Sequence, residues 1–137
     1  MYATQPGLAS WLTHLIALLT HVVAYTSLAP QVTPSKFKGF NSSSTSISLS
    51  WDPIPPGQVA GVLRQFYITY RQLNTTDNTL RTIAVPITNL SFELTSLRKY
   101  TTYRLEIKAA TKFPGMPTAP IDITTDEDGE SLYFFLV

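Results

Sequence analysis

Residues 45–51 read Thr45-Ser46-Ile47-Ser48-Leu49-Ser50-Trp51. Apolar and polar side chains alternate here, and a period of two places one set on each face of a β-strand. The residues that follow are Asp52-Pro53-Ile54-Pro55-Pro56-Gly57. They end the strand, because proline lacks the N–H that a β-ladder needs and glycine permits a tight turn. The segment predicts a half-buried strand followed by a stiff loop.

The same alternation returns along the chain as far as residue 125. We expect further strands at residues 37–40, 66–71, 79–85, 91–97 and 102–111 and around Ile121 and Ile123. A polar turn separates the third and fourth strands at residues 74–78, and a loop rich in proline and glycine is expected at residues 112–120. About seven short strands with turns at this spacing predict an all-β, immunoglobulin-like antiparallel sandwich.

The inward-facing side chains of these strands are the predicted core. They are Ile47, Leu49, Trp51, Phe66, Ile68, Tyr70, Leu94, Leu97, Tyr103, Leu105, Ile107 and Ala109. The sequence contains no cysteine. We therefore expect packing rather than disulfides to hold the sandwich together.

Several of these segments resemble the fibronectin type III family. Residues 48–53 resemble its second strand, whose tryptophan fills the centre between the sheets, and residues 67–70 resemble its third strand. The set Leu97, Thr101, Tyr103, Ile107 and Ala109 is similar to the corner before the family's sixth strand. In that corner the leucine fills the end of the core and the tyrosine hydroxyl bonds back to the preceding turn.

The resemblance covers residues 34–125 and has departures. Lys99 stands where the family usually has a proline, which we expect to loosen the corner slightly. The chain has neither Arg-Gly-Asp nor a Trp-Ser-x-Trp-Ser repeat. The resemblance therefore does not support integrin binding by that route, and it weakens a cytokine-receptor interpretation.

Both ends of the chain differ in composition from residues 30–125, which we assign to the domain. Residues 1–29 include the apolar window 11–24, which has the length of a signal-peptide core, with cleavage expected after Ala24. No Lys or Arg precedes Lys36, so a membrane anchor or a poorly ordered start remains an alternative.

Residues 126–137 form a tail that is first acidic and then apolar. Its apolar part, residues 131–137, fits either the start of a truncated transmembrane segment or an edge segment that packs on the sandwich. Membrane association through such a segment therefore stays open.

Catalysis is not expected. The two histidines, His14 and His21, both precede the domain, and no glycine-rich phosphate loop follows a strand. We predict no cofactor and no metal site. The net charge of the chain is +1. Within residues 31–125, Lys and Arg outnumber Asp and Glu, but these charges are too dilute to indicate nucleic-acid binding.

Candidate sites lie in turns and loops. Three Asn-x-Ser/Thr sequons at Asn41, Asn74 and Asn89 are glycosylation candidates. A second set consists of Ile54, Phe113 and Met116, which we expect in proline-stiffened loops at one end of the sandwich, as a contact surface for a partner protein. The alternative is that Phe113 and Met116 fold back and cap the core.

Charged residues gather on the outward face of the third and sixth predicted strands. Arg71, Arg104 and Lys108 surround Tyr67 and Glu106. A solvated face with cross-strand charge pairs is the simpler interpretation. A patch for an anionic partner, such as a sulfated glycan, is the alternative.

The resemblance, the leader and the sequons together favour a secreted or cell-surface module for protein binding or adhesion, of receptor or matrix type. A structural spacer without its own ligand, extracellular or intracellular, is the alternative. A fold shared by many unrelated functions does not identify the ligand.

Overall fold

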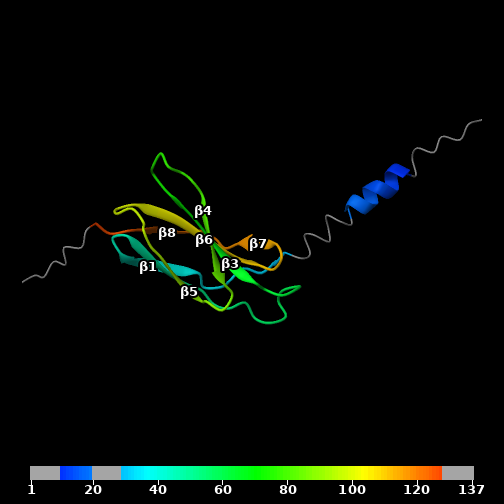
Figure 1. The fold of residues 1–137 in the computed structure, drawn as a ribbon, viewed down its shortest axis with the longest axis horizontal. Coiled ribbons are helices and arrows are strands. Elements are labelled where there is room, and N and C mark those ends of the chain that lie inside the picture. Colours follow the sequence, from blue (N-terminus) through cyan, green and yellow to red (C-terminus); the bar gives the residue numbers. More distant parts are fainter. Residues whose placement is uncertain (1–9, 20–28, 128–137) are drawn as a thin grey trace, which may run out of the picture.

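The computed structural model describes residues 10–19 and 29–127, and Figure 1 shows their arrangement. Residues 10–19 are helical and belong to neither sheet. The strands are β1 (Lys38–Ser43), β2 (Ser46–Ser50), β3 (Gln65–Gln72), β4 (Arg81–Pro86), β5 (Ser91–Leu94), β6 (Thr102–Ala110), β7 (Pro114–Pro117) and β8 (Ile121–Thr124). The molecule is an all-β sandwich.

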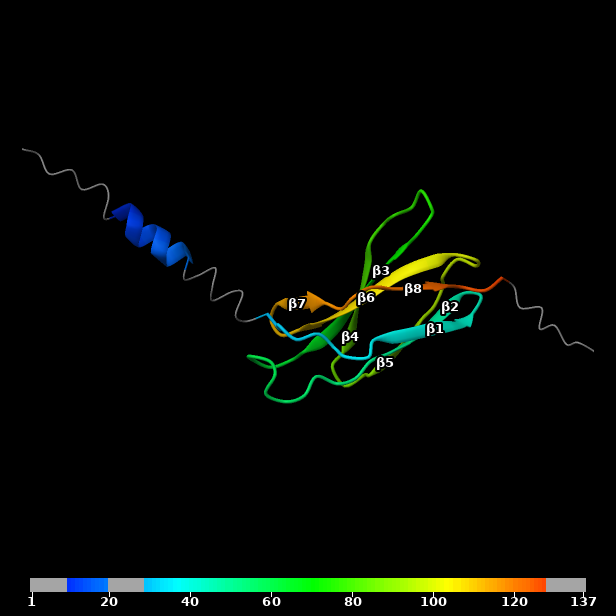
Figure 2. The same cartoon turned by 180° about the vertical axis from the view of Figure 1, so that it is seen from behind.

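All strand pairs are antiparallel, and they form two sheets. One sheet has the order β1-β2-β5, and the other has the order β4-β3-β6-β7 with β8 also paired to β6. Figure 2 shows β1, β2 and β5 grouped on one side of the molecule. β3 and β6 form the centre of the larger sheet, with Phe66 opposite Ala109 and Ile68 opposite Ile107.

The described residues contain eight strands where about seven were expected, because the segment predicted as a loop at residues 112–120 contains β7. β7 and β8 pair with successive parts of β6, so the last strand of the sandwich is split. β7 begins and ends with a proline, and an edge strand tolerates the missing N–H groups of proline.

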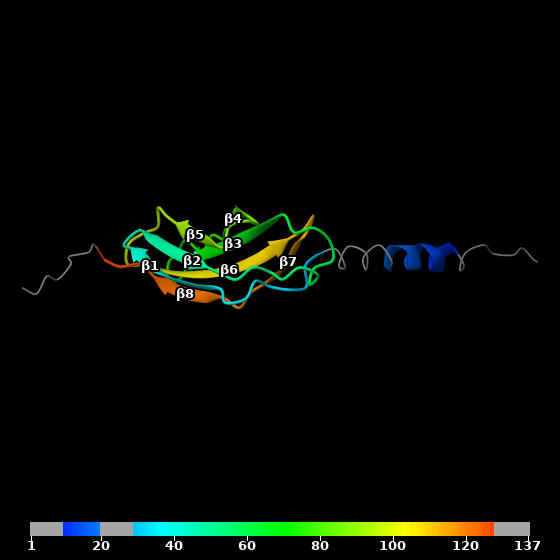
Figure 3. The same cartoon turned by 90° about the horizontal axis from the view of Figure 1, so that it is seen from below.

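Gly115 explains how β7 is held in place. A Cβ atom at this position would lie 2.3 Å from the carbonyl oxygen of Pro30, so only glycine fits without a shift of the backbone. The neighbouring Met116 N donates to Pro30 O at 3.4 Å. Figure 3 shows residues 29–36 running alongside β7 on their way to β1. The lead-in segment is therefore part of the sandwich.

Between the sheets lies one buried cluster. It contains every residue of the predicted core except Tyr70, which is half-buried and packs against it, and it also contains Val85. Trp51 sits at its centre, with ring centroids 5.4 Å from Phe66 and 6.5 Å from Phe37. Its Nε1 is buried, and within the described residues it has no hydrogen-bond partner. The indole therefore contributes through packing.

The corner before β6 has the geometry that the resemblance implies. Leu97 is buried at the end of the core, and Tyr103 Oη accepts a hydrogen bond from Arg98 N at 2.8 Å. Thr125 adds a second tie, because its Oγ1 donates to Arg98 O at 2.7 Å. Two hydrogen bonds, one to the backbone N and one to the backbone O of Arg98, thus hold the corner although Lys99 replaces the usual proline.

Candidate functional site

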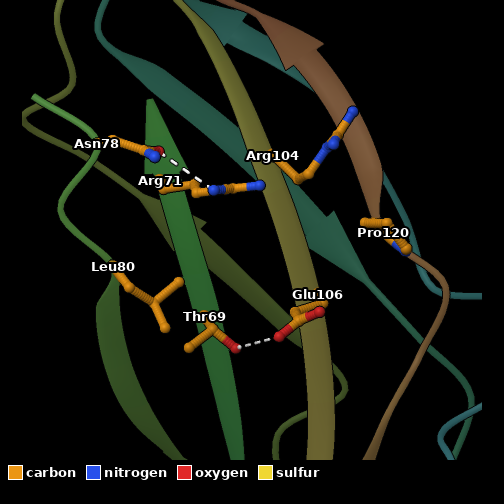
Figure 4. Close-up of a pocket in the computed structure, with 7 residues that line it drawn as sticks. All are labelled: Thr69, Arg71, Asn78, Leu80, Arg104, Glu106 and Pro120. Atoms are coloured by element: carbon orange, nitrogen blue, oxygen red, sulfur yellow. Dashed lines mark hydrogen bonds between the residues drawn. The ribbon is translucent and has the colours of Figure 1, made fainter. Parts of the chain in front are cut away.

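A hollow of about 400 Å³ lies on the outward face of the larger sheet, and we call it the arginine hollow. It is lined by Thr69, Arg71, Asn78, Leu80, Arg104, Glu106 and Pro120 (Figure 4). The register explains the grouping, because Thr69 lies opposite Glu106 and Arg71 opposite Arg104 on β3 and β6. Strand pairing therefore brings two positive charges side by side.

Arg104 is held by an acidic partner on β8. Its Nε and Nη2 donate to the two carboxylate oxygens of Asp122 at 2.8 and 2.7 Å, which is a bidentate pair. The hydrogen bonds from Arg104 lower the pKa of Asp122 and raise that of the guanidinium, and the charge of Arg71 lowers the pKa of Asp122 further. Asp122 therefore partly offsets the like-charge contact across β3 and β6.

Arg71 is held differently. Its Nη1 donates to the side-chain oxygen of Asn78 at 3.2 Å, so this bond leaves the positive charge of the guanidinium uncompensated. Figure 4 shows the Arg71 side chain lying across the hollow between Asn78 and Arg104. A guanidinium offers five N–H donors, and an acidic group that enters the hollow can accept from those that remain.

Thr69 and Glu106 form the floor of the hollow. Thr69 points outward as the alternation predicts, yet it is only 2 % exposed. Its Oγ1 donates to Glu106 Oε1 at 3.3 Å. Leu80, which is 62 % exposed, adds an apolar wall. The hollow thus combines a cation with an apolar contact.

The structure brings together only part of the predicted charged patch. Arg71, Arg104 and Glu106 line the hollow, whereas Tyr67 and Lys108 pair further along the same two strands. Asp122, the partner of Arg104, was not predicted from the sequence. The alternation in the sequence could have indicated the position of Asp122, since Ile121 and Ile123 pack against the core and Asp122 between them faces outward.

The predicted contact loops lie at one end of the sandwich, as Figures 1 and 2 show for residues 52–64 and β7. Ile54 packs against the core cluster, and Phe113 is half-buried. Met116 is 56 % exposed, so the alternative in which it caps the core was wrong. Val62, which is 77 % exposed in the same loop as Ile54, was missed. We call Val62 and Met116 the apolar end.

The three sequons differ in their surroundings. Asn41 is half-buried in the edge strand β1, whereas Asn74 and Asn89 are exposed in turns. Asn74 has a positive φ of 56°, a conformation that asparagine tolerates better than most residues.

No group of three or more His, Asp or Glu side chains within residues 10–19 and 29–127 is placed to hold a metal ion. No helix in those same ranges is long and apolar enough to cross a membrane. The predicted cleavage point after Ala24 and most of the tail lie outside them.

Comparison with protein families matches residues 32–124 to the fibronectin type III domain. The chain belongs to the fibronectin type III family. This match spans both sheets and includes the corner at Tyr103 and the split last strand.

Its relatives are much longer proteins. Over 100 residues the chain is 36 % identical to "Phosphatidylinositol phosphatase PTPRQ" from Homo sapiens. This alignment covers 72 % of the chain and 4 % of that protein. It is 30 % identical over 101 residues to "Receptor-type tyrosine-protein phosphatase F" from Homo sapiens, covering 72 % of this chain and 5 % of the relative. The chain therefore spans about one-twentieth of the relatives' length, and their catalytic activity does not transfer to it.

Solved structures show the same fold. The fibronectin domains FN1–FN3 of chicken CNTN1 match with a TM-score of 0.65 at 24 % identity, covering 72 % of this chain and 33 % of that one. A domain of this family thus occurs within a receptor-type phosphatase, and the solved structures confirm its fold.

Proposed function

We propose that this fibronectin type III domain belongs to a secreted or cell-surface protein and binds another protein there. The observation that carries the proposal is the 30 % identity to a short part of a receptor-type tyrosine-protein phosphatase. The window 11–24 and the sequons support an extracellular location. We keep residues 1–29 as a signal-peptide-like leader segment with cleavage after Ala24, residues 30–125 as the domain and residues 126–137 as a tail.

The apolar end is the contact surface that we propose. Val62 and Met116 expose large apolar side chains, and backbone that is already stiff loses little entropy when it binds. Val62 follows the proline-rich part of its loop, and Met116 lies within β7 between two prolines. The arginine hollow adds a second contact for an acidic side chain of the same partner.

Intact mass and N-terminal sequence of the full chain, expressed in secreting animal cells, test the location. A product in the medium that begins at Tyr25 and carries glycan mass supports the proposal. A product that stays inside the cell, begins at Met1 and carries no glycan contradicts it and favours the intracellular spacer.

Cell binding tests the contact surface. We expect the secreted domain, fused to a dimeric tag, to bind cells that display its partner, and the double variant Val62→Ser and Met116→Ser to lose that binding. Thr88→Ala is a matched control, because Thr88 is exposed and lies outside both proposed contacts. Equal binding by the double variant and the unchanged domain would exclude the apolar end.

A further inference from the structure

A second hollow lies at the end of the sandwich away from β7, and it joins a sequon to an exposed aromatic ring. Its volume is about 330 Å³, and Asn74 and Tyr100 both line it together with Leu73 and threonines of β6 and β8. Leu73 N donates to Thr102 O at 2.8 Å, which fixes the β3–β4 loop against the start of β6. Two segments distant in sequence are therefore held side by side.

Asn74 is presented to solvent by a well-fixed loop. Thr75 Oγ1 donates to Asp77 O at 2.9 Å and lies 3.4 Å from Gln72 Oε1, so the loop has internal support. Within residues 29–127 no hydrogen bond engages the side chain of Asn74. Thr76, the hydroxyl residue of the sequon, is exposed. The amide is therefore free to carry a sugar without loss of a native contact.

Tyr100 is unusual in two respects. Its side chain is 73 % exposed, and its φ of 50° lies in the left-handed region that bulky residues rarely adopt. Its N donates to Asp126 O at 3.1 Å, which helps to hold this conformation. Strained residues that the surroundings hold in place are concentrated at ligand sites. Tyr100 therefore offers an exposed aromatic ring at the same hollow that Asn74 lines.

We infer that Asn74 carries an N-linked glycan whose first N-acetylglucosamine packs on the Tyr100 ring. A sugar ring presents C–H groups on its faces, which suit the electron-rich face of an aromatic ring, and hydroxyl groups at its edge. Thr101, Thr102 and Thr124 line the hollow and offer hydroxyl partners to that edge. The inference rests on the proposed extracellular location, because N-glycans are added in the secretory pathway.

The other two sequons are natural controls. Asn41 is half-buried in β1, and the Ser43 hydroxyl of its sequon hydrogen-bonds to Ser46 Oγ at 2.6 Å. Asn89 Oδ1 already accepts from Thr88 Oγ1 at 3.1 Å. A sugar at either position would lack Tyr100 as a neighbour, since neither residue lines its hollow.

The test uses the full chain behind a heterologous signal peptide, in animal cells that leave glycans in the high-mannose form. Mass spectrometry of glycopeptides gives the occupancy of Asn74, and endoglycosidase H then trims each glycan to one N-acetylglucosamine. We expect the trimmed protein to melt about 4 °C above its Asn74→Gln variant, a typical effect of one modest contact in a small domain. Asn89→Gln should not lower the melting temperature by a similar amount.

Substitutions of Tyr100 test whether its ring causes the stabilisation by the sugar. In a Tyr100→Gly background the difference between the trimmed and the Asn74→Gln forms should vanish, and in a Tyr100→Phe background it should persist. Glycine suits the left-handed conformation, so Tyr100→Gly is expected to fold. In the unchanged protein, nuclear Overhauser effects should connect the sugar protons to the Tyr100 ring.

Two outcomes would overturn the inference. One is secreted protein without glycan at Asn74, and the other is an equal stabilisation by the sugar in the Tyr100 and Tyr100→Gly backgrounds. Neither outcome bears on the contact surface or on the natural location. If the chain is not exported when residues 1–29 serve as its own leader, the proposed location is contradicted. The test of the hollow is unaffected, because it uses a heterologous signal peptide.

Discussion

The two faces of β3 and β6 are built from the same strands but are governed by different forces. On the inner face, Phe66, Ile68 and Ile107 are fully buried, and their contribution grows with the apolar area removed from water. On the outer face, Arg71 and Arg104 are partly exposed, and each is fixed by one specific partner. The inner face therefore accounts for stability, and the outer face is available for recognition.

The largest expected effect is on the inner face. Trp51→Ala should destabilise the domain by about 3 to 5 kcal/mol, because it deletes a buried indole between the two sheets. Chemical denaturation measures the change in midpoint. Phe40→Ala is the control, since Phe40 is a large aromatic residue of the same domain and is 64 % exposed on β1. An unchanged midpoint for Trp51→Ala would mean that the centre of the core lies elsewhere.

A smaller effect is expected where the inner face ends at the corner. Tyr103→Phe keeps the ring and removes the acceptor of Arg98 N, at a cost of roughly 0.5 to 1.5 kcal/mol with the fold intact. Thermal unfolding compares it with Tyr70→Phe, a half-buried tyrosine of the same sheet. Equal effects in the two variants would show that the corner bond adds nothing specific.

The smallest effect is expected on the outer face and depends on pH. The pKa of Asp122 is lowered in the folded state, so its contribution is complete above the unfolded value of about 3.9 and is lost as pH falls through the folded value. Asp122→Asn should lower the melting temperature slightly at pH 7, and the difference from the unchanged protein should shrink below about pH 4.

Salt provides the control for this prediction, because ion pairs between exposed groups weaken as ionic strength rises. A difference that stays the same at low pH and at high salt would show that Asp122 acts through packing rather than charge.

Much of the fold could be predicted because alternation is a local signal. Ile47, Leu49 and Trp51 needed only their neighbours in sequence to be assigned to one face, and the burial energy of each is large. β7 was missed because Pro114, Gly115 and Pro117 are typical of a loop, and only the approach of Pro30 and the free edge of β6 make a strand of them.

The candidate sites were less predictable, since each depends on contacts between segments distant in sequence. The charged patch was expected on the correct face, but the partners Asn78 and Asp122 come from another loop and another strand. The contact loops were expected at one end, as observed. However, only the structure shows that Met116 and Val62 are exposed there whereas Ile54 packs against the core.

The sequence by itself determined the sandwich class and nearly all of the core, because a period of two assigns each strand's side chains to one face, and its corner motif at Leu97 to Ala109 carried the resemblance to the family. Only the tertiary structure decided which of two adjacent arginines has an acidic partner and which sequon shares a hollow with an exposed tyrosine. Individual surface contacts have small energies and depend on side-chain geometry, so no local pattern in the sequence specifies them.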